Sequence, residues 1–157
     1  MTRLRTLTEC TVLDEWVDYN GHMNDAAYAI PFSKAVEAFI RDLSMDAGYR
    51  DREQLTIYTL ENHIRYVREA FAGERLQVDM QLVDRDTKRA HVFLRLVDGD
   101  GAVRATSEQM LMVIDTSAGR PGRFRGEPLE RLEAMAEADR ALPVPKEIGR
   151  PIGIRRG

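Results

Sequence analysis

Polar side chains are concentrated in the segment DYNGHMNDAAY, residues 18–28, which directly precedes an apolar stretch. Asp18 supplies a carboxylate that can act as a base or as a nucleophile, and His22 and Asn24 can fix the loop, orient that carboxylate or align a water molecule. Gly21 lets the backbone approach a ligand closely. Main-chain amides of residues 22–25, at the start of a helix, can stabilise negative charge on a carbonyl oxygen. The segment therefore predicts an active site, with Asp18 as the candidate catalytic group.

Each of these residues also has a structural explanation. Asn24 and Asp25 stand just before a predicted helix, where Asn and Asp cap more often than they catalyse. A lone histidine such as His22 is more often a hydrogen-bonded structural residue, and both roles stay open here. Tyr28 is expected to pack in the core while offering its hydroxyl group. Asp18 lies too far before the helix to be a simple cap, and this position favours catalysis.

A second informative stretch is TIYTLENHIRYV, residues 56–67, which has the composition of a strand. A period of two predicts one face with polar side chains and one face with larger apolar side chains. The polar row is most simply a solvated face. The first face carries Glu61, His63 and Arg65, and the second carries Tyr58, Leu60, Ile64 and Tyr66.

The elements that must position these residues follow from the apolar periodicity. Residues 11–18 are predicted to form a first strand, and Cys10 is expected to be a bystander in a strand. Apolar residues from Phe32 to Leu43 recur at helical spacing and predict one helix of about four turns. Pro31 suits its first turn, and Gly48 suits its left-handed end.

The middle of the chain changes to strand periodicity. Four strands are predicted, at residues 56–67, 76–83, 89–97 and 102–114, joined by turns rich in Asp and Gly. Four strands with short turns predict an antiparallel meander, and one apolar helical stripe must be covered by it. The predicted architecture is α+β, with a sheet wrapped around a central helix.

The C-terminal part continues with a Gly-, Pro- and Arg-rich connector, a peripheral helix around residues 129–142 and an extended tail on the surface or on a partner. We expect one domain over residues 1–157, with its core at about 10–115 and the C-terminal segments at 116–157.

Composition excludes several classes of function. One cysteine, Cys10, excludes an internal disulfide and a thiolate zinc cage. A net charge of −3 argues against general nucleic-acid binding. The three histidines lack metal-ligand spacing, so no metal is expected. No stretch is long and apolar enough for a membrane span, and a cytoplasmic protein without a membrane partner is predicted.

A family resemblance adds to this interpretation. The pattern D-x-N-x-H-x-N-x-x-x-Y, carried by Asp18, Asn20, His22, Asn24 and Tyr28, resembles that of hotdog-fold acyl-CoA thioesterases, as do the long helix and four strands. This group includes hydroxybenzoyl-CoA and acyl-carrier-protein thioesterases. The resemblance covers residues 10–115, and YVREAFAGERLQV resembles the hairpin between the family's second and third strands. More narrowly, EWVDYNGHMNDAAY, YTLENHIRYVREAFAG and TSEQMLMVIDT resemble the betainyl-CoA thioesterases associated with L-carnitine dehydrogenase.

The resemblance implies a hotdog fold, with five or six antiparallel strands around one long helix and a peripheral C-terminal helix. It implies hydrolysis of an acyl-CoA, possible action on betainyl-CoA in carnitine breakdown, and no cofactor, because coenzyme A is part of the substrate. It also implies a homodimer or dimer of dimers whose site lies between protomers. Asp18 would be general base or nucleophile, and the choice between these roles stays open.

Further residues are implied as parts of that site. Substrate-binding candidates are Asn20, Gly21, Met23 and Tyr28, with Glu61 and Tyr66 on the lining strand. A quaternary ammonium group would be held over aromatic faces near a carboxylate, with rings from Trp16, Tyr19, Tyr28, Tyr58 and Tyr66 and charge from Glu61. Coenzyme A phosphates could meet Arg65, Arg68, Lys88 and Arg89, although exposed basic residues are ordinarily solubilising.

Two other functions remain alternatives. One is a non-catalytic acyl-CoA binding or sensing protein of the same fold, and the other is a hotdog dehydratase. The acyl specificity and the choice between coenzyme A and a carrier protein stay open at this point.

Overall fold

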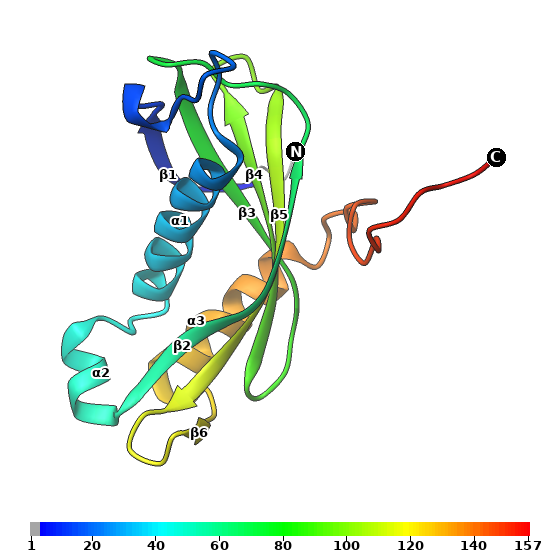
Figure 1. Cartoon of the computed structure of the whole chain (residues 1–157). Helices are drawn as coiled ribbons and strands as arrows, with labels where there is room; N and C mark the ends of the chain where they lie inside the picture. Colours follow the sequence, from blue (N-terminus) through cyan, green and yellow to red (C-terminus); the bar gives the residue numbers. More distant parts are fainter. Residues whose placement is uncertain (1–3) are drawn as a thin grey trace.

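A computed structural model of the chain describes residues 4–157 (Figure 1). Six strands form one antiparallel sheet with the order β1-β3-β4-β5-β2, and β6 pairs with β5. The strands are β1 (Arg5–Thr11), β2 (Leu55–Tyr66), β3 (Arg75–Arg85), β4 (Arg89–Asp98), β5 (Val103–Asp115) and β6 (Arg120–Pro121). The helices are η1 (Asp14–Trp16), η2 (Asp25–Tyr28), α1 (Ala29–Asp42), α2 (Ala47–Glu53) and α3 (Gly126–Asp139).

Helix α1 lies along one face of the curved sheet (Figure 1). Its apolar stripe is buried, and both Phe32 and Phe39 are 0% exposed. Alternate residues of β3, β4 and β5 supply the other half of the core, among them Met80, Leu94 and Leu111. Burial of this stripe is what the helical periodicity predicted, because one apolar face of a helix must be covered by another element. The predicted hotdog architecture, including the C-terminal helix α3, is confirmed.

The prediction of a first strand at residues 11–18 is wrong. The strand is β1, at Arg5–Thr11, which contains Cys10 and pairs with β3. Residues 14–16 instead form the 3₁₀ helix η1, and Val17 makes an isolated bridge to Met23. The edge strand β1 is only partly buried on either face. It therefore shows little of the apolar alternation on which the prediction depended.

The predicted role of Gly48 is also wrong. Helix α1 ends earlier, and Ser44 takes the positive φ of 61° that follows it. Gly48 lies inside the short helix α2, whose first turn is capped by Asp46: its carboxylate accepts a 2.8 Å hydrogen bond from the Tyr49 amide. The Asp46 cap signal was the stronger one at this position.

The predicted meander holds only for β3, β4 and β5. Strand β2 pairs with β5 rather than with β3, so residues 67–74 form a crossover and not a hairpin. This segment does contain the predicted turn: Gly73 has φ +82°, and the Glu74 amide donates to the Phe71 carbonyl. That turn directs the chain into β3 without pairing it to β2.

A bulge in β2 changes which of its side chains share a face. Thr59 pairs with Leu111, but Glu61 pairs with Met110, so Leu60 is an extra residue. Because directly opposed residues point to the same side of a sheet, Ile64 and Tyr66 face the side of α1. Tyr58 faces the outer side together with Glu61. The predicted shared face of Tyr58 and Tyr66 is therefore wrong.

The tail after α3 lies on the surface, as predicted, and crosses the outer side of the sheet. The Gln81 side chain donates to the Pro143 carbonyl, and the Gly149 amide donates to the Glu108 carboxylate at 3.0 and 3.1 Å. Within residues 4–157, no helix is long and apolar enough to cross a membrane.

Asp139 at the end of α3 secures this helix to the sheet. Its carboxylate is 8% exposed and accepts a 2.8 Å hydrogen bond from the Leu82 amide. Leu82 lies beyond Met80, the residue at which the pairing of β3 with β1 ends. We expect Asp139→Ala to lower the free energy of unfolding by about 1–3 kcal/mol, because the amide stays buried without an acceptor. Denaturant unfolding measures this loss. Asp139→Asn keeps an acceptor oxygen and should recover part of it, and equal losses in both variants would contradict the explanation.

Candidate active site

The polar segment after η1 forms a tight loop. The Asp18 amide donates to the His22 carbonyl, and the Gly21 amide donates back to the Asp18 carbonyl. Gly21 has φ +82°, a conformation that favours glycine. Met23 is 2% exposed, and its amide donates to the Ala70 carbonyl at 2.7 Å. The loop is thus fixed at its base, while its polar tip remains open to solvent.

The amides of this loop are partly occupied. The Asn24 amide donates to the Trp16 carbonyl, as the Met23 amide does to Ala70. The side chain of Asn24 caps η2 by accepting from the Ala26 amide at 2.9 Å. Within residues 4–157, the amides of His22 and Asp25 make no such bond, so only these two of the predicted donors can meet a carbonyl oxygen.

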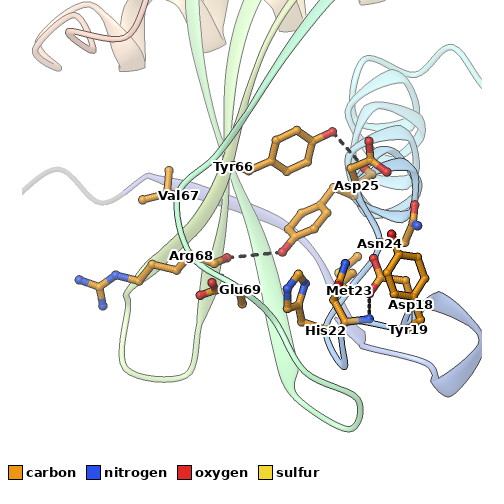
Figure 2. Close-up of a pocket in the computed structure, with 12 residues that line it drawn as sticks. Asp18, Tyr19, His22, Met23, Asn24, Asp25, Tyr66, Val67, Arg68 and Glu69 are labelled. Atoms are coloured by element: carbon orange, nitrogen blue, oxygen red, sulfur yellow. Dashed lines mark hydrogen bonds between the residues drawn. The ribbon is translucent and has the colours of Figure 1, made fainter.

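A cavity of about 530 Å³ opens beside this loop (Figure 2). One wall is the loop with the start of η2, and the other is the end of β2 with the first residues of the crossover. Its lining residues are Asp18, Tyr19, Asn20, His22, Met23, Asn24, Asp25, Tyr28, Tyr66, Val67, Arg68 and Glu69. The structure therefore brings all three predicted catalytic residues to one cavity.

Asp18 and His22 carry the side chains in the cavity that could take part in catalysis. One Asp18 carboxylate oxygen accepts a 2.8 Å hydrogen bond from the Asn20 amide, and no other donor within residues 4–157 contacts this carboxylate. Both Asp18 and His22 are half-buried. The His22 ring makes no hydrogen bond to any described residue, and both roles considered for it stay open. One carboxylate oxygen and one imidazole are thus available to a substrate or a water molecule.

Two tyrosines form the floor and side of the cavity. The Tyr28 and Tyr66 ring centroids are 5.1 Å apart, with the ring planes at 80°. The Tyr28 hydroxyl donates to the Arg68 carbonyl at 3.4 Å, and the Tyr66 hydroxyl donates to the Asp25 carbonyl at 3.1 Å. Burial raises the pKa of both phenols, so both keep the protons that these bonds require. The two rings are therefore held in fixed planes.

Arg104 on β5 secures the crossover wall. Its guanidinium forms ion pairs of 3.0 Å with Glu74 and with Asp98, and it donates to the Glu69 carbonyl. The Arg104 carbonyl accepts from the amides of residues 67 and 68. Sequence reasoning missed Arg104 and Glu69, because their positions depend on the crossover, which was predicted as a hairpin.

Several predicted site residues lie outside the cavity lining. Trp16 packs against the core. Gly21 has no side chain, and its contribution is the positive φ in the loop. Tyr58 and Glu61 face the outer side of the sheet because of the β2 bulge. Arg89 pairs with Asp86, and this contact lowers the Asp86 pKa to about 2. Arg65 and Lys88 also lie outside the lining, so Arg68 is the one predicted phosphate-binding residue that reaches it.

A second cavity of about 530 Å³ lies on the outer side of the sheet. His91 contacts Glu108 at 3.0 Å there, and Glu61, His63 and Arg150 are among the other polar residues that line it. No group of three or more potential metal ligands converges within the described residues. The combination of a free carboxylate, an imidazole, amides and aromatic rings occurs at the first cavity, which is the candidate active site.

Comparisons with known proteins give the relatives of this chain. Residues 12–152 match the sequence model of the thioesterase-like superfamily. A betainyl-CoA thioesterase of Pseudomonas aeruginosa is 43% identical over 98% of both chains. An L-carnitine dehydrogenase/betainyl-CoA thioesterase of Rhizobium meliloti is 36% identical over 96% of this chain, which corresponds to 30% of that larger protein.

Solved structures show the same fold at full length. A Staphylococcus aureus protein in complex with CoA superimposes with a TM-score of 0.90, at 30% identity over 97% of both chains. A Pseudomonas putida protein described as a thioesterase superimposes with a TM-score of 0.83, at 32% identity over 98% of this chain and 99% of the other.

Proposed function

The chain belongs to the thioesterase-like superfamily, and we propose that it hydrolyses betainyl-CoA to the free acid and coenzyme A. Hydrolysis of an acyl-CoA thioester follows from the family and from the full-length likeness to a named thioesterase. The choice of betainyl as the acyl group rests on the name of that relative. The single structural observation that carries the proposal is the position of the Asp18 carboxylate. It lies in a cavity beside the His22 and Asp25 amides, and one of its two oxygens accepts no hydrogen bond from a described residue.

In the proposed reaction, Asp18 removes a proton from a water molecule as the water oxygen attacks the thioester carbon. The amides of His22 and Asp25 stabilise the oxyanion that forms on the carbonyl oxygen. The carbon–sulfur bond then breaks, and the thiolate of coenzyme A leaves and takes up a proton. Direct attack by Asp18, with water hydrolysing the resulting anhydride, is the second route. Neither route requires a metal or a cofactor beyond the substrate, and CoA thioesters suit a cytoplasmic enzyme.

A screen of CoA thioesters tests this function. The protein should release free thiol from betainyl-CoA faster than from short-chain, aromatic or long-chain acyl-CoA substrates at equal concentration. A thiol reagent that changes absorbance on reaction measures each rate. Tight binding of betainyl-CoA without thiol release would instead indicate a binding or sensing protein. With an enoyl-CoA as substrate, loss of enoyl absorbance while the thioester stays intact would indicate a dehydratase.

We also propose that the protein is a homodimer, joined by the outer edge of β2. Among the described strands, none pairs with this edge, and it exposes the apolar side chain of Leu60 at 48%. Unpaired apolar edges favour pairing with another chain. Light scattering should give a mass twice the 17.9 kDa of one chain, or a multiple of that dimer. Leu60→Lys should shift the mass toward one chain, and a wild-type mass of one chain would contradict the proposal.

A further inference from the structure

The Tyr28 and Tyr66 rings form a corner inside the candidate active site. Their planes are nearly perpendicular, their centroids are 5.1 Å apart, and both residues line the cavity. Tyr66 is 54% exposed and stands at the cavity wall, whereas Tyr28 is 3% exposed and closes its floor. Hydrogen bonds to main-chain carbonyls fix both rings, so little conformational entropy is lost when a ligand enters the corner.

The charged side chains that line the cavity are mostly acidic. Three carboxylates line it, from Asp18, Asp25 and Glu69, against one guanidinium from Arg68. Figure 2 shows the Arg68 guanidinium directed away from Tyr66, while Asp25 lies beside the Tyr66 hydroxyl. The interior of the site is therefore acidic, and a cation is the ligand that this field favours.

We propose that Tyr66 and Tyr28, with the Asp25 carboxylate, form the subsite that holds the trimethylammonium group of the acyl chain and so determine specificity for a cationic acyl group. This inference rests on the proposed thioesterase function. A quaternary ammonium has no proton to donate, so attraction to aromatic faces and to a nearby carboxylate is what can hold it. Of the other sequence candidates for this role, Tyr58, Trp16 and Glu61 do not line the cavity. Tyr19 lines it, but its side chain is 98% exposed and therefore offers a cation little shielding from water.

The test compares betainyl-CoA with 3,3-dimethylbutyryl-CoA, in which a carbon atom replaces the quaternary nitrogen. The two acyl groups have nearly the same shape and differ in charge. The wild-type ratio of kcat/KM should favour betainyl-CoA. Tyr66→Leu should lower this ratio about threefold to thirtyfold, because a cation–π contact is lost. Tyr66→Phe keeps the ring and should retain most of the ratio. Asp25→Asn should lower the ratio as well, and added salt should weaken that part of the effect.

Tyr58→Leu is the matched control. Tyr58 lies on the same strand, is also 54% exposed and faces the outer side, so this variant should keep the wild-type ratio. A wild-type ratio near one would overturn the inference while leaving thioesterase function intact. An unchanged ratio in Tyr66→Leu would place the cation elsewhere and also overturn it. Failure to hydrolyse any thioester would instead reject the proposed function itself.

Discussion

Asp18→Asn is expected to lower kcat for thioester hydrolysis by about 10²- to 10⁴-fold, the usual contribution of a positioned base. The asparagine oxygen can still accept the hydrogen bond from the Asn20 amide, so the loop should keep its shape. Only the negative charge and the capacity to take a proton are lost. Thiol release under saturating substrate measures kcat, and thermal unfolding checks that the variant remains folded.

Asp14→Asn is the control for a change of charge near the site. Asp14 is an exposed residue of η1 and does not line the cavity, so its variant should keep the wild-type rate. Wild-type turnover in Asp18→Asn would remove Asp18 from the mechanism. A single turnover in H₂¹⁸O adds a distinction between the two routes, because label recovered in the Asp18 carboxylate requires direct nucleophilic attack.

Phe39→Ala is expected to lower the free energy of unfolding by about 3–5 kcal/mol, because it removes a fully buried aromatic ring and leaves a cavity. For a chain of this size, the loss corresponds to a fall in Tm of about 6–20 °C. Phe39 is central to the face of α1 that the sheet covers. Calorimetry at fixed protein concentration measures the change, since self-association would otherwise shift Tm.

Glu37→Ala tests whether the loss in Phe39→Ala comes from burial and not from the helix itself. Glu37 is exposed on the same helix, and surface changes of this kind usually stay within about 0.5 kcal/mol. A loss in Phe39→Ala as small as that of Glu37→Ala would show that the covered face of α1 contributes little to stability.

Much of the architecture could be predicted because its signals are local. The stripe from Phe32 to Leu43 and the alternation from Leu76 to Leu82 each depend on neighbouring residues only, and both elements are present. The partner of β2 could not be predicted, since strand pairing is a contact between segments distant in sequence. The β2 bulge was also missed, and one extra residue was enough to exchange the faces assigned to Tyr58 and Tyr66.

The candidate site could be predicted to the extent that its residues lie in one continuous segment. Asp18, His22 and Asn24 lie in eleven residues, and the structure places them at one cavity. Glu69 and Arg68 come from the crossover, which approaches the loop only because β2 runs along the far edge of β5. The capping role of Asn24 was weighed from its position before the helix, and its side chain does cap η2. Whether it also takes part in catalysis stays a prediction.

The ion pairs of Arg104 link the wall of the candidate active site to the turn between β4 and β5. Asp98, at the tip of the β4–β5 hairpin, pairs with Arg104, and Arg104 in turn fixes the segment that presents Glu69. A substitution of Asp98 would therefore remove one of the two ion pairs of Arg104 and weaken the support of the segment that lines the cavity. Variation at residue 98 thus has a route to a change in the cavity wall that leaves the Asp18 carboxylate in place.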